Sequence, residues 1–354
     1  MGRPFRFMIA IGALVVALLL TVGPSEAREC RTFLPQSQSW CGVTATGPTF
    51  ADPEVPEDSV FGRAYYVRQA DNANVYPEPS RATAPVRNVG DGFLYATVNS
   101  WEKINGETWY KINHGEYMHE DDIRPVTASD FQGVTVLRQP ERPFGWIVQD
   151  VVPSSEPDGE PNEQFDEMPR FTFFEIYDAV LGEDDWIWYD LGDGRWVRQT
   201  YMSIVEVSPR PEGVGPADYW TEVDLYEQTF AAYEGDRMVY ATLISSGLNR
   251  WPTREGLFQV WSRFERYKMS GAEGKVDYYF IEDVPYIMYY DELMGIALHG
   301  TYWHDRYGYK HSHGCVNMPI LDAEWVFNWS AEADNDLFVW VHTADPMEHL
   351  AVFQ

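Results

Sequence analysis

Cysteine and basic residues are scarce in this 354-residue chain, which has 3 Cys and 26 Lys and Arg against 55 Asp and Glu. The formal net charge is −29. A surface this acidic repels nucleic acid and anionic lipid, so we expect neither as a partner. We interpret the charge as an adaptation for solubility or salt, and the alternative, attraction of amine-bearing ligands, stays open. A chain of this length predicts two or three domains.

The N-terminus carries an uncharged run that follows two arginines. Arg3 and Arg6 precede residues 7–25, and Ser25-Glu26-Ala27 offers a small-x-small cleavage site. We therefore predict a signal peptide over residues 1–27. The alternative is an uncleaved membrane anchor, because about 20 apolar residues suffice to span a bilayer. With either one, the body of the protein lies outside the cytoplasm, secreted or associated with the cell wall.

The three cysteines divide into a pair and a single thiol. Cys30 and Cys41 lie eleven positions apart within residues 28–60, where turn-forming residues predict a linker or short cap. In an exported chain this spacing favours a disulfide between them. Cys315 then remains as an unpaired thiol.

Cys315 follows a concentration of histidines. Four of the 8 His in the chain precede it within sixteen positions: His299, His304, His311 and His313. A thiol needs a neighbouring base to become a nucleophile, and a small neighbour lets backbone N–H groups reach a developing oxyanion. His299 and His313 offer the base, and Gly314 is the small neighbour. These residues predict a cysteine nucleophile, with His304 and His311 expected to be solvent-exposed loop residues.

The same stretch resembles a family signature. His299-Gly300-Thr301, followed by Ser312-His313-Gly314-Cys315-Val316-Asn317, is similar to the motif of the L,D-transpeptidases, cysteine enzymes that cross-link bacterial peptidoglycan. The resemblance implies a catalytic domain over residues 219–345, a linker before it at 209–218 and a C-terminal tail at 346–354. It also implies peptidoglycan stem peptides as partners and no cofactor. Arg254 departs from the family, which usually has Pro at that turn.

The resemblance further implies roles for the catalytic residues. Cys315 would attack the substrate carbonyl, and His299 would act as general base, oriented by the backbone carbonyl of Gly300. His313 would line the acyl pocket or stabilise the thiolate. Gly314 and Gly300 would support the oxyanion through their backbone.

Substrate contacts are expected from the same region. Ser312 would hold the loop through hydrogen bonds or contact substrate, and Asn317 would hold the substrate backbone or cap the next turn. The loop over residues 301–311 would frame the cleft. We expect two of its four aromatic residues to line the substrate channel, with Tyr302 and Trp303 as first candidates and Tyr307 and Tyr309 as the others.

Residues 61–127 and 128–208 look like two copies of one small β-barrel. Short β-forming runs alternate with turn residues, and a pattern in the first segment recurs at a constant offset of 79: Trp109-Tyr110, Gly115, Tyr117 and Val126 match Trp188-Tyr189, Gly194, Trp196 and Val205. These repeats resemble bacterial Src-homology-3-like domains, which either grip the cell wall or act as spacers. Residues 147–169, with seven acidic and no basic residues, predict a mobile loop within the second copy.

The complete expectation is therefore a mainly β protein in which a sandwich-like L,D-transpeptidase domain follows two small barrels. Within residues 219–345, β-type runs at 229–233 and 238–244 predict a hairpin, and residues 323–329 predict one helix. The histidine spacing fits no common zinc motif and no Glu base accompanies it, so we expect no metal. A cysteine endopeptidase, an L,D-carboxypeptidase and a non-catalytic wall-binding protein are the alternatives. The oligomeric state stays open.

Overall fold

The structure is a computed structural model that describes residues 48–57, 59, 65–272, 274–333 and 337–353. The chain divides into two compact units, Met1–Gly47 and Pro48–Gln354, and every described residue belongs to the second. The predicted signal peptide and the predicted Cys30–Cys41 disulfide lie outside the described residues. Among the described residues, no helix is long and apolar enough to cross a membrane.

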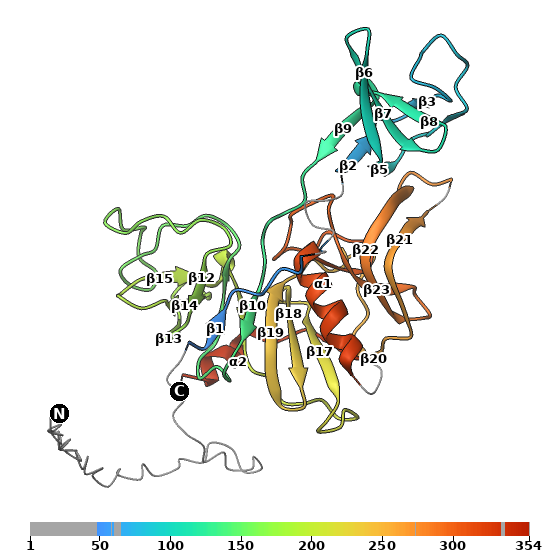
Figure 1. The fold of residues 1–354 in the computed structure, drawn as a ribbon. Helices are drawn as coiled ribbons and strands as arrows, with labels where there is room; N and C mark the ends of the chain where they lie inside the picture. Colours follow the sequence, from blue (N-terminus) through green and yellow to red (C-terminus); the bar gives the residue numbers. More distant parts are fainter. Residues whose placement is uncertain (1–47, 58, 60–64, 273, 334–336, 354) are drawn as a thin grey trace, which may run out of the picture. The chain divides into compact units, whose positions relative to one another are not determined.

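The described part is mainly β, which confirms the predicted class (Figure 1). One seven-stranded sheet contains five strands from residues 219–345, the expected catalytic domain. Its order is β1 (Phe50–Ala51), β10 (Val134–Val136), β19 (Arg237–Leu243), β18 (Thr229–Glu234), β17 (Tyr219–Asp224), β25 (Phe338–His342) and β20 (Gly256–Gln259). The antiparallel pair β18 and β19 is the predicted hairpin.

A second seven-stranded sheet carries the motif from His299 to Asn317. Along its main path the order is β24 (Val316–Met318), β23 (Ile296–Gly300), β22 (Tyr279–Asp291), β5 (Phe93–Val98), β2 (Tyr65–Gln69) and β9 (Ile123–Val126), and β21 (Ser262–Gly271) pairs with β22. Three strands of the preceding β-domain, defined here as residues 65–126, thus belong to the same sheet as the catalytic strands.

The two large sheets and helix α1 (Ile320–Trp329) share one apolar core. Alternating residues of the strands point into it, as expected for sheets with one buried face. Its members include Phe230 and Tyr240 from the first sheet, Leu298 and Val316 from the second, and Ala323 from the helix. The predicted helix over residues 323–329 is confirmed and begins three residues earlier.

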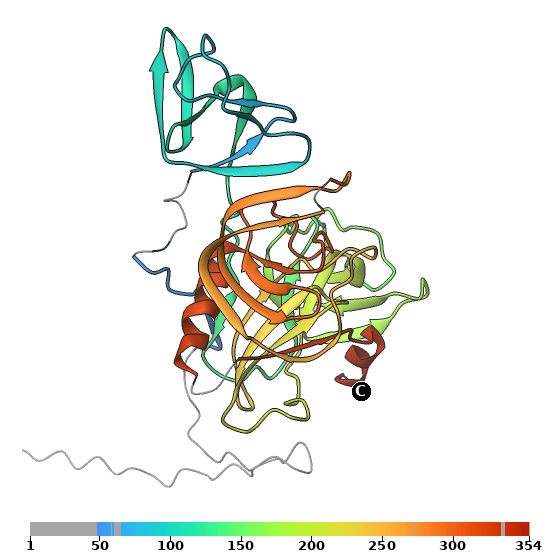
Figure 2. The same cartoon turned by 90° about the vertical axis from the view of Figure 1, so that its right-hand side faces the viewer.

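The remaining strands form four small sheets. They are β3 (Asn74–Val75) with β4 (Arg87–Asn88), β6 (Ser100–Ile104) with β7 (Glu107–Asn113) and β8 (Glu116–His119), β11 (Phe144–Ile147) between β12 (Phe173–Glu175) and β16 (Met202–Val205), and β14 (Ile187–Asp190) between β13 (Asp178–Leu181) and β15 (Trp196–Arg198). A short helix α2 (Pro346–Ala351) lies near the C-terminus, in the region expected to be a tail. Figure 2 shows these elements from a second direction.

The offset of 79 recurs in the secondary structure. A short 3₁₀ helix at Glu120–Asp122 is followed directly by β9, and a second at Gln199–Tyr201 is followed directly by β16, each 79 positions later. The hairpin turns before them contain Gly115 with φ +67° and Gly194 with φ +71°, a backbone region that favours glycine. The two segments therefore share the local order hairpin, 3₁₀ helix and closing strand.

Two expected boundaries differ from the structure. β1 comes from the predicted linker at 28–60 and β10 from the predicted second repeat, yet both extend the first catalytic sheet through β19. Strands of two and three residues have too little periodicity to be recognised from sequence. Isolated β-bridges join Val151 to Met168 and Ser154 to both Pro161 and Trp196 within and beside the acidic segment 147–169. The prediction of a mobile loop is therefore wrong for these positions.

Candidate active site

Parallel pairing of two short strands brings the predicted nucleophile beside the predicted base. β23 pairs with β24 so that His299 lies opposite Asn317 and Leu298 opposite Val316. Cys315 is the residue directly before β24. The turn into this strand uses Gly314 at φ +121°, which a residue with a side chain rarely adopts.

Hydrogen bonds hold this turn in place. The Ser312 hydroxyl donates to the carbonyl of Cys315 and accepts the N–H of Gly314 at 3.1 Å. The Thr253 hydroxyl donates to the Gly314 carbonyl and accepts the Gly247 N–H, each at 2.8 Å. Ser312 therefore fixes the loop. Because the Gly314 N–H is already bonded, its predicted part as an oxyanion donor is corrected to a structural one.

His299 is buried and has the expected orientation. Its Nδ1 lies 3.0 Å from the carbonyl oxygen of Gly300. A carbonyl can only accept, so Nδ1 carries the hydrogen and Nε2 carries the free lone pair. Burial lowers the pKa of His299 to about 4, opposed by that hydrogen bond. The imidazole is therefore a neutral base at neutral pH, and Gly300 acts through its carbonyl.

Cys315 is a protonated thiol at rest. Burial raises its pKa to about 11, and the backbone N–H of Ala297 acts weakly in the opposite direction. In the described part of the chain, no hydrogen bond joins the thiol to His299. The resting site thus contains a neutral thiol and a neutral imidazole, and a proton has to move when the thiol reacts.

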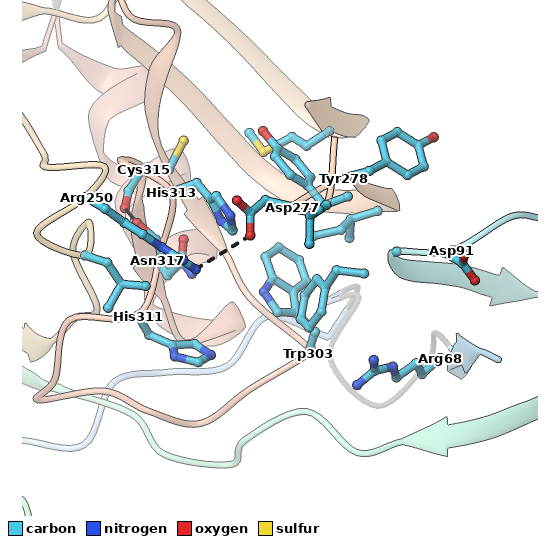
Figure 3. A pocket seen from close by; sticks show the side chains of 18 of the residues that line it. Arg68, Asp91, Arg250, Asp277, Tyr278, Trp303, His311, His313, Cys315 and Asn317 are labelled. Carbon is cyan, nitrogen blue, oxygen red and sulfur yellow. Dashed lines mark hydrogen bonds and ion pairs between the residues drawn. The ribbon is translucent and has the colours of Figure 1, made fainter. Parts of the chain in front are cut away.

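Cys315 is one of the residues that line a cleft of about 490 Å³ (Figure 3). The predicted site residues that line it are His299, Trp303, Ser312, His313, Cys315 and Asn317. The exposed His313 ring lies against Trp251 at 3.8 Å and faces Tyr279 at 5.3 Å between ring centroids. Trp251 and Tyr279 were not recognised from sequence, because each lies far from the motif along the chain.

Three of the four loop aromatics do not line the cleft. Tyr302 is buried, stacks on Tyr66 at 3.7 Å between centroids and donates its hydroxyl to the Glu282 carbonyl at 2.7 Å. Tyr307 is also buried, and the Tyr309 hydroxyl donates to a backbone carbonyl at residue 148. The expectation that two of the four line the channel, with Tyr302 among the candidates, is therefore wrong; Trp303 alone of these four lines it.

His304 also differs from its expected exposure. Its side chain is partly buried, and burial lowers its pKa to about 2, with His311 nearby adding to the effect. Its Nε2 lies 2.8 Å from the Asn317 side-chain nitrogen, and its ring centroid lies 4.5 Å from that of His311. Both histidines are thus partly buried rather than free in solvent, and His311 lines the cleft.

Arg254, the departure from the family turn, has a structural partner. Its guanidinium makes two hydrogen bonds of 2.7 Å to the two carboxylate oxygens of the buried Asp291. A bidentate pair of this kind restrains the turn without proline. Across the described ranges, no group of three or more His, Cys, Asp or Glu residues is placed to bind a metal ion.

Comparisons with known proteins agree with the motif. Residues 218–342 match the family model YkuD, described as the L,D-transpeptidase catalytic domain. The Bacillus subtilis (strain 168) protein YciB, which is named as a provisional L,D-transpeptidase, is 30% identical over 122 residues, covering 30% of this chain and 59% of the relative. The chain therefore spans less than two thirds of that relative's length.

The chain is also similar to solved structures that are named as L,D-transpeptidases, but their TM-scores over the whole chain are low. The catalytic domain of the Enterococcus faecium L,D-transpeptidase is 30% identical, covers 36% of this chain and 98% of its own, and has a TM-score of 0.31. The Mycobacterium smegmatis L,D-transpeptidase is 14% identical, with coverage of 62% and 94% and a TM-score of 0.33. At such low scores the assignment depends on the family model, which identifies residues 218–342 as an L,D-transpeptidase catalytic domain.

Proposed function

We propose that this protein is an exported L,D-transpeptidase that cross-links peptidoglycan through a thioester on Cys315. The observation that supports it is that His299 lies on β23 and Cys315 directly precedes β24, the strand that pairs with β23, and that both residues line one cleft. A nucleophile beside a base that is itself oriented by a third group is the arrangement that covalent acyl transfer requires.

In the first step, the Cys315 sulfur bonds to the carbonyl carbon of the third residue of a tetrapeptide stem. The thiol proton passes to His299 Nε2, and the carbonyl oxygen becomes an oxyanion, for which we assign the backbone N–H of Cys315 as a donor. Collapse breaks the peptide bond, and the imidazolium returns its proton to the leaving amine of D-alanine. The thioester remains on the enzyme.

In the second step, the amine nitrogen of another stem bonds to the thioester carbonyl carbon and passes a proton to His299 Nε2. The carbon–sulfur bond then breaks, and the imidazolium gives that proton to the Cys315 sulfur, which leaves the cross-linked amide and the free thiol. Proton transfer and attack are expected to be coupled. A pKa of about 11 for Cys315 and of about 4 for His299 favours the neutral thiol and imidazole over a preformed thiolate–imidazolium pair. The thiolate character therefore develops only as the carbon–sulfur bond forms.

The proposal is tested with defined tetrapeptide donors and an amine acceptor, with products weighed by mass spectrometry. We expect release of D-alanine and a cross-linked product, both dependent on Cys315. If tripeptide is the only product although the acceptor is present, the result would instead indicate an L,D-carboxypeptidase. No covalent chemistry at all would favour a wall-binding protein.

Export is part of the proposal and has its own test. It is motivated by the uncharged run at residues 7–25 and the site at Ser25-Glu26-Ala27. Fractionation of cells that express the full chain should recover it outside the cytoplasm, and N-terminal sequencing should show Arg28 as the first residue. Recovery in the cytoplasm with residues 1–27 intact would contradict export.

A further inference from the structure

The β-domain is joined to the catalytic sheet by main-chain hydrogen bonds. β5 pairs in parallel with β22, with Phe93 opposite Tyr279 and Tyr95 opposite Ile281, and the Phe93 N–H donates to the Tyr278 carbonyl at 2.9 Å. Ladder hydrogen bonds fix both the position and the register of a strand. This end of the β-domain is therefore held at a defined place beside the cleft.

Aromatic packing reinforces the same junction. Tyr66 of the β-domain stacks on Tyr302 of the catalytic loop, and both side chains are buried. The Tyr95 ring centroid lies 6.4 Å from that of Trp303, which lines the cleft with Cys315. As a result, the β-domain forms one wall of the cleft, with Arg68, Asp71, Asp91, Gly92 and Phe93.

Arg68 is the cation in this wall. Its side chain is exposed and directed toward the cleft, with its guanidinium carbon 5.5 Å from the centroid of the Phe93 ring (Figure 3). The second arginine in the cleft, Arg250, lies 3.8 Å from a carboxylate oxygen of Asp277. By contrast, Arg68 has no carboxylate within 4.0 Å in the part of the chain that the structure describes.

The two acidic residues that the β-domain contributes to the wall, Asp71 and Asp91, accept hydrogen bonds from other residues. Asp71 accepts the Gly92 N–H at 3.3 Å, and Asp91 accepts the side-chain amide of Asn72. The Arg68 guanidinium is hydrogen-bonded to the Tyr95 hydroxyl, which leaves its other N–H donors available to the cleft, in a chain where acidic residues outnumber basic ones 55 to 26. A guanidinium in this position is suited to a carboxylate, which it can bind through two parallel hydrogen bonds.

We propose that Arg68 binds a free carboxylate of the peptide substrate, so that the β-domain is part of the substrate site rather than a spacer. This inference rests on the proposed function, since it assumes a stem-peptide donor. Such a donor carries a carboxylate at its C-terminus, and it carries a second one where the residue at position three of the stem has an acidic side chain. Either carboxylate could accept the same two hydrogen bonds from the Arg68 guanidinium.

The test compares substrates and variants in one cycle, with the full exported chain. Tetrapeptides are prepared intact, with a C-terminal carboxamide, or with the side-chain carboxylate of the third residue amidated. We expect wild-type protein to lose about tenfold in kcat/KM on one of these amidations, which identifies the carboxylate that Arg68 binds. For the intact peptide, Arg68→Gln should have a kcat/KM about tenfold lower than that of wild-type protein. Amidation of the carboxylate that Arg68 binds should not lower the kcat/KM of this variant any further.

Arg87→Gln is the matched control, because Arg87 belongs to the same domain but pairs with Glu116 at 2.9 Å and does not line the cleft. The ratio of kcat/KM for the intact peptide to kcat/KM for the amidated peptide should be the same in Arg87→Gln as in wild-type protein. Alkylation of Cys315 by iodoacetamide at the wild-type rate, together with an unchanged Tm, shows that Arg68→Gln is folded; if it is not, Arg68→Lys enters the same cycle.

The inference would be overturned if the folded Arg68 variant had the same ratio of kcat/KM between the intact and the amidated peptide as wild-type protein. Equal kcat/KM for all three peptides with wild-type protein would also overturn it. Absence of any Cys315-dependent product from wild-type protein is a separate result, because it contradicts the proposed function itself.

Discussion

His304 Nε2 and the side-chain nitrogen of Asn317 lie 2.8 Å apart beside the cleft. The Arg306 N–H donates to Nδ1 of the same imidazole at 3.1 Å, so a neutral His304 carries its hydrogen on Nε2. Two donors cannot bond to each other. The amide orientation that satisfies both groups places Oδ1 of Asn317 against His304 and its NH₂ group on the other side, which makes His304 a positioning residue for Asn317.

Replacing His304 by Ala should therefore slow acylation of Cys315 by about tenfold, because the Asn317 amide loses the partner that orients it. Asn317→Ala should have a similar effect, and the double variant should be no slower than either single one. Stopped-flow acylation with a carbapenem measures all three. Additive effects would show that the two residues act independently.

His311→Ala is the control for this prediction. His311 contacts His304 through its ring but bonds to Ser246 through its backbone, so its loss should change acylation by less than about threefold. Treatment with a chelator should leave all rates unchanged. Loss of activity on chelation, together with a large effect of His304→Ala, would support a zinc site instead.

The pKa values of the catalytic pair predict an unusual pH profile. With His299 neutral above about pH 4 and Cys315 protonated below about pH 11, His299-assisted acylation should be nearly constant from pH 6 to 9. Alkylation by iodoacetamide, which needs free thiolate, should rise about tenfold per pH unit over the same range. If Cys315 were a thiolate at rest, the rate of alkylation would already be maximal at pH 7 and would not rise further with pH.

Glu206 is predicted to make stability depend on pH. Burial, with nearby carboxylates, raises its folded pKa to about 7, above the ordinary value of 4.5. The folded state therefore holds a proton that the unfolded state releases, so this contribution is present below pH 4.5 and is lost as the pH rises through 7. It amounts to at most about 3 kcal/mol.

The measurement is the difference in unfolding free energy between wild-type protein and Glu206→Gln at several pH values, which cancels the opposite contributions of buried histidines. We expect Glu206→Gln to gain stability relative to wild type as the pH rises from 5 to 8. A difference that does not change with pH would show that Glu206 is ionised in the folded protein throughout.

Asp322 holds helix α1 against the first sheet. This buried carboxylate accepts the Tyr240 hydroxyl at 2.6 Å, the Thr242 hydroxyl and the Gly133 N–H at 3.0 Å. Asp322→Ala leaves three donors without a partner and should cost about 3–5 kcal/mol in urea denaturation. Asp236→Ala, which removes an exposed carboxylate, should cost less than about 0.5 kcal/mol. A cost below about 1 kcal/mol for Asp322→Ala would contradict this assignment.

Local patterns in the sequence predicted which residues of the candidate site lie close together. The motif from His299 to Asn317 placed base and nucleophile together, and the structure explains why: the two ends of this segment are paired parallel strands. The offset of 79 likewise predicted two segments with the same local order of elements. In both cases the signal was periodic or contiguous along the chain.

Features that depend on distant partners could not be predicted. Tyr302 and Trp303 are neighbours in an irregular loop, and which of them faces the cleft is decided by Tyr66, more than two hundred residues away, which stacks on Tyr302. The parallel pairing of β5 with β22 has the same character, since neither strand specifies its partner. For that reason the β-domain was expected only to precede the catalytic domain, and Arg68 was not recognised.

The most direct test of the account is the intact mass of the protein after incubation with a tetrapeptide donor. Wild-type protein should gain the mass of the acyl group on Cys315. Cys315→Ala should gain nothing, and His299→Ala should gain the group about 10²–10⁴ times more slowly. An acyl adduct of the same mass on Cys315→Ala would contradict the central claim that this thiol is the nucleophile.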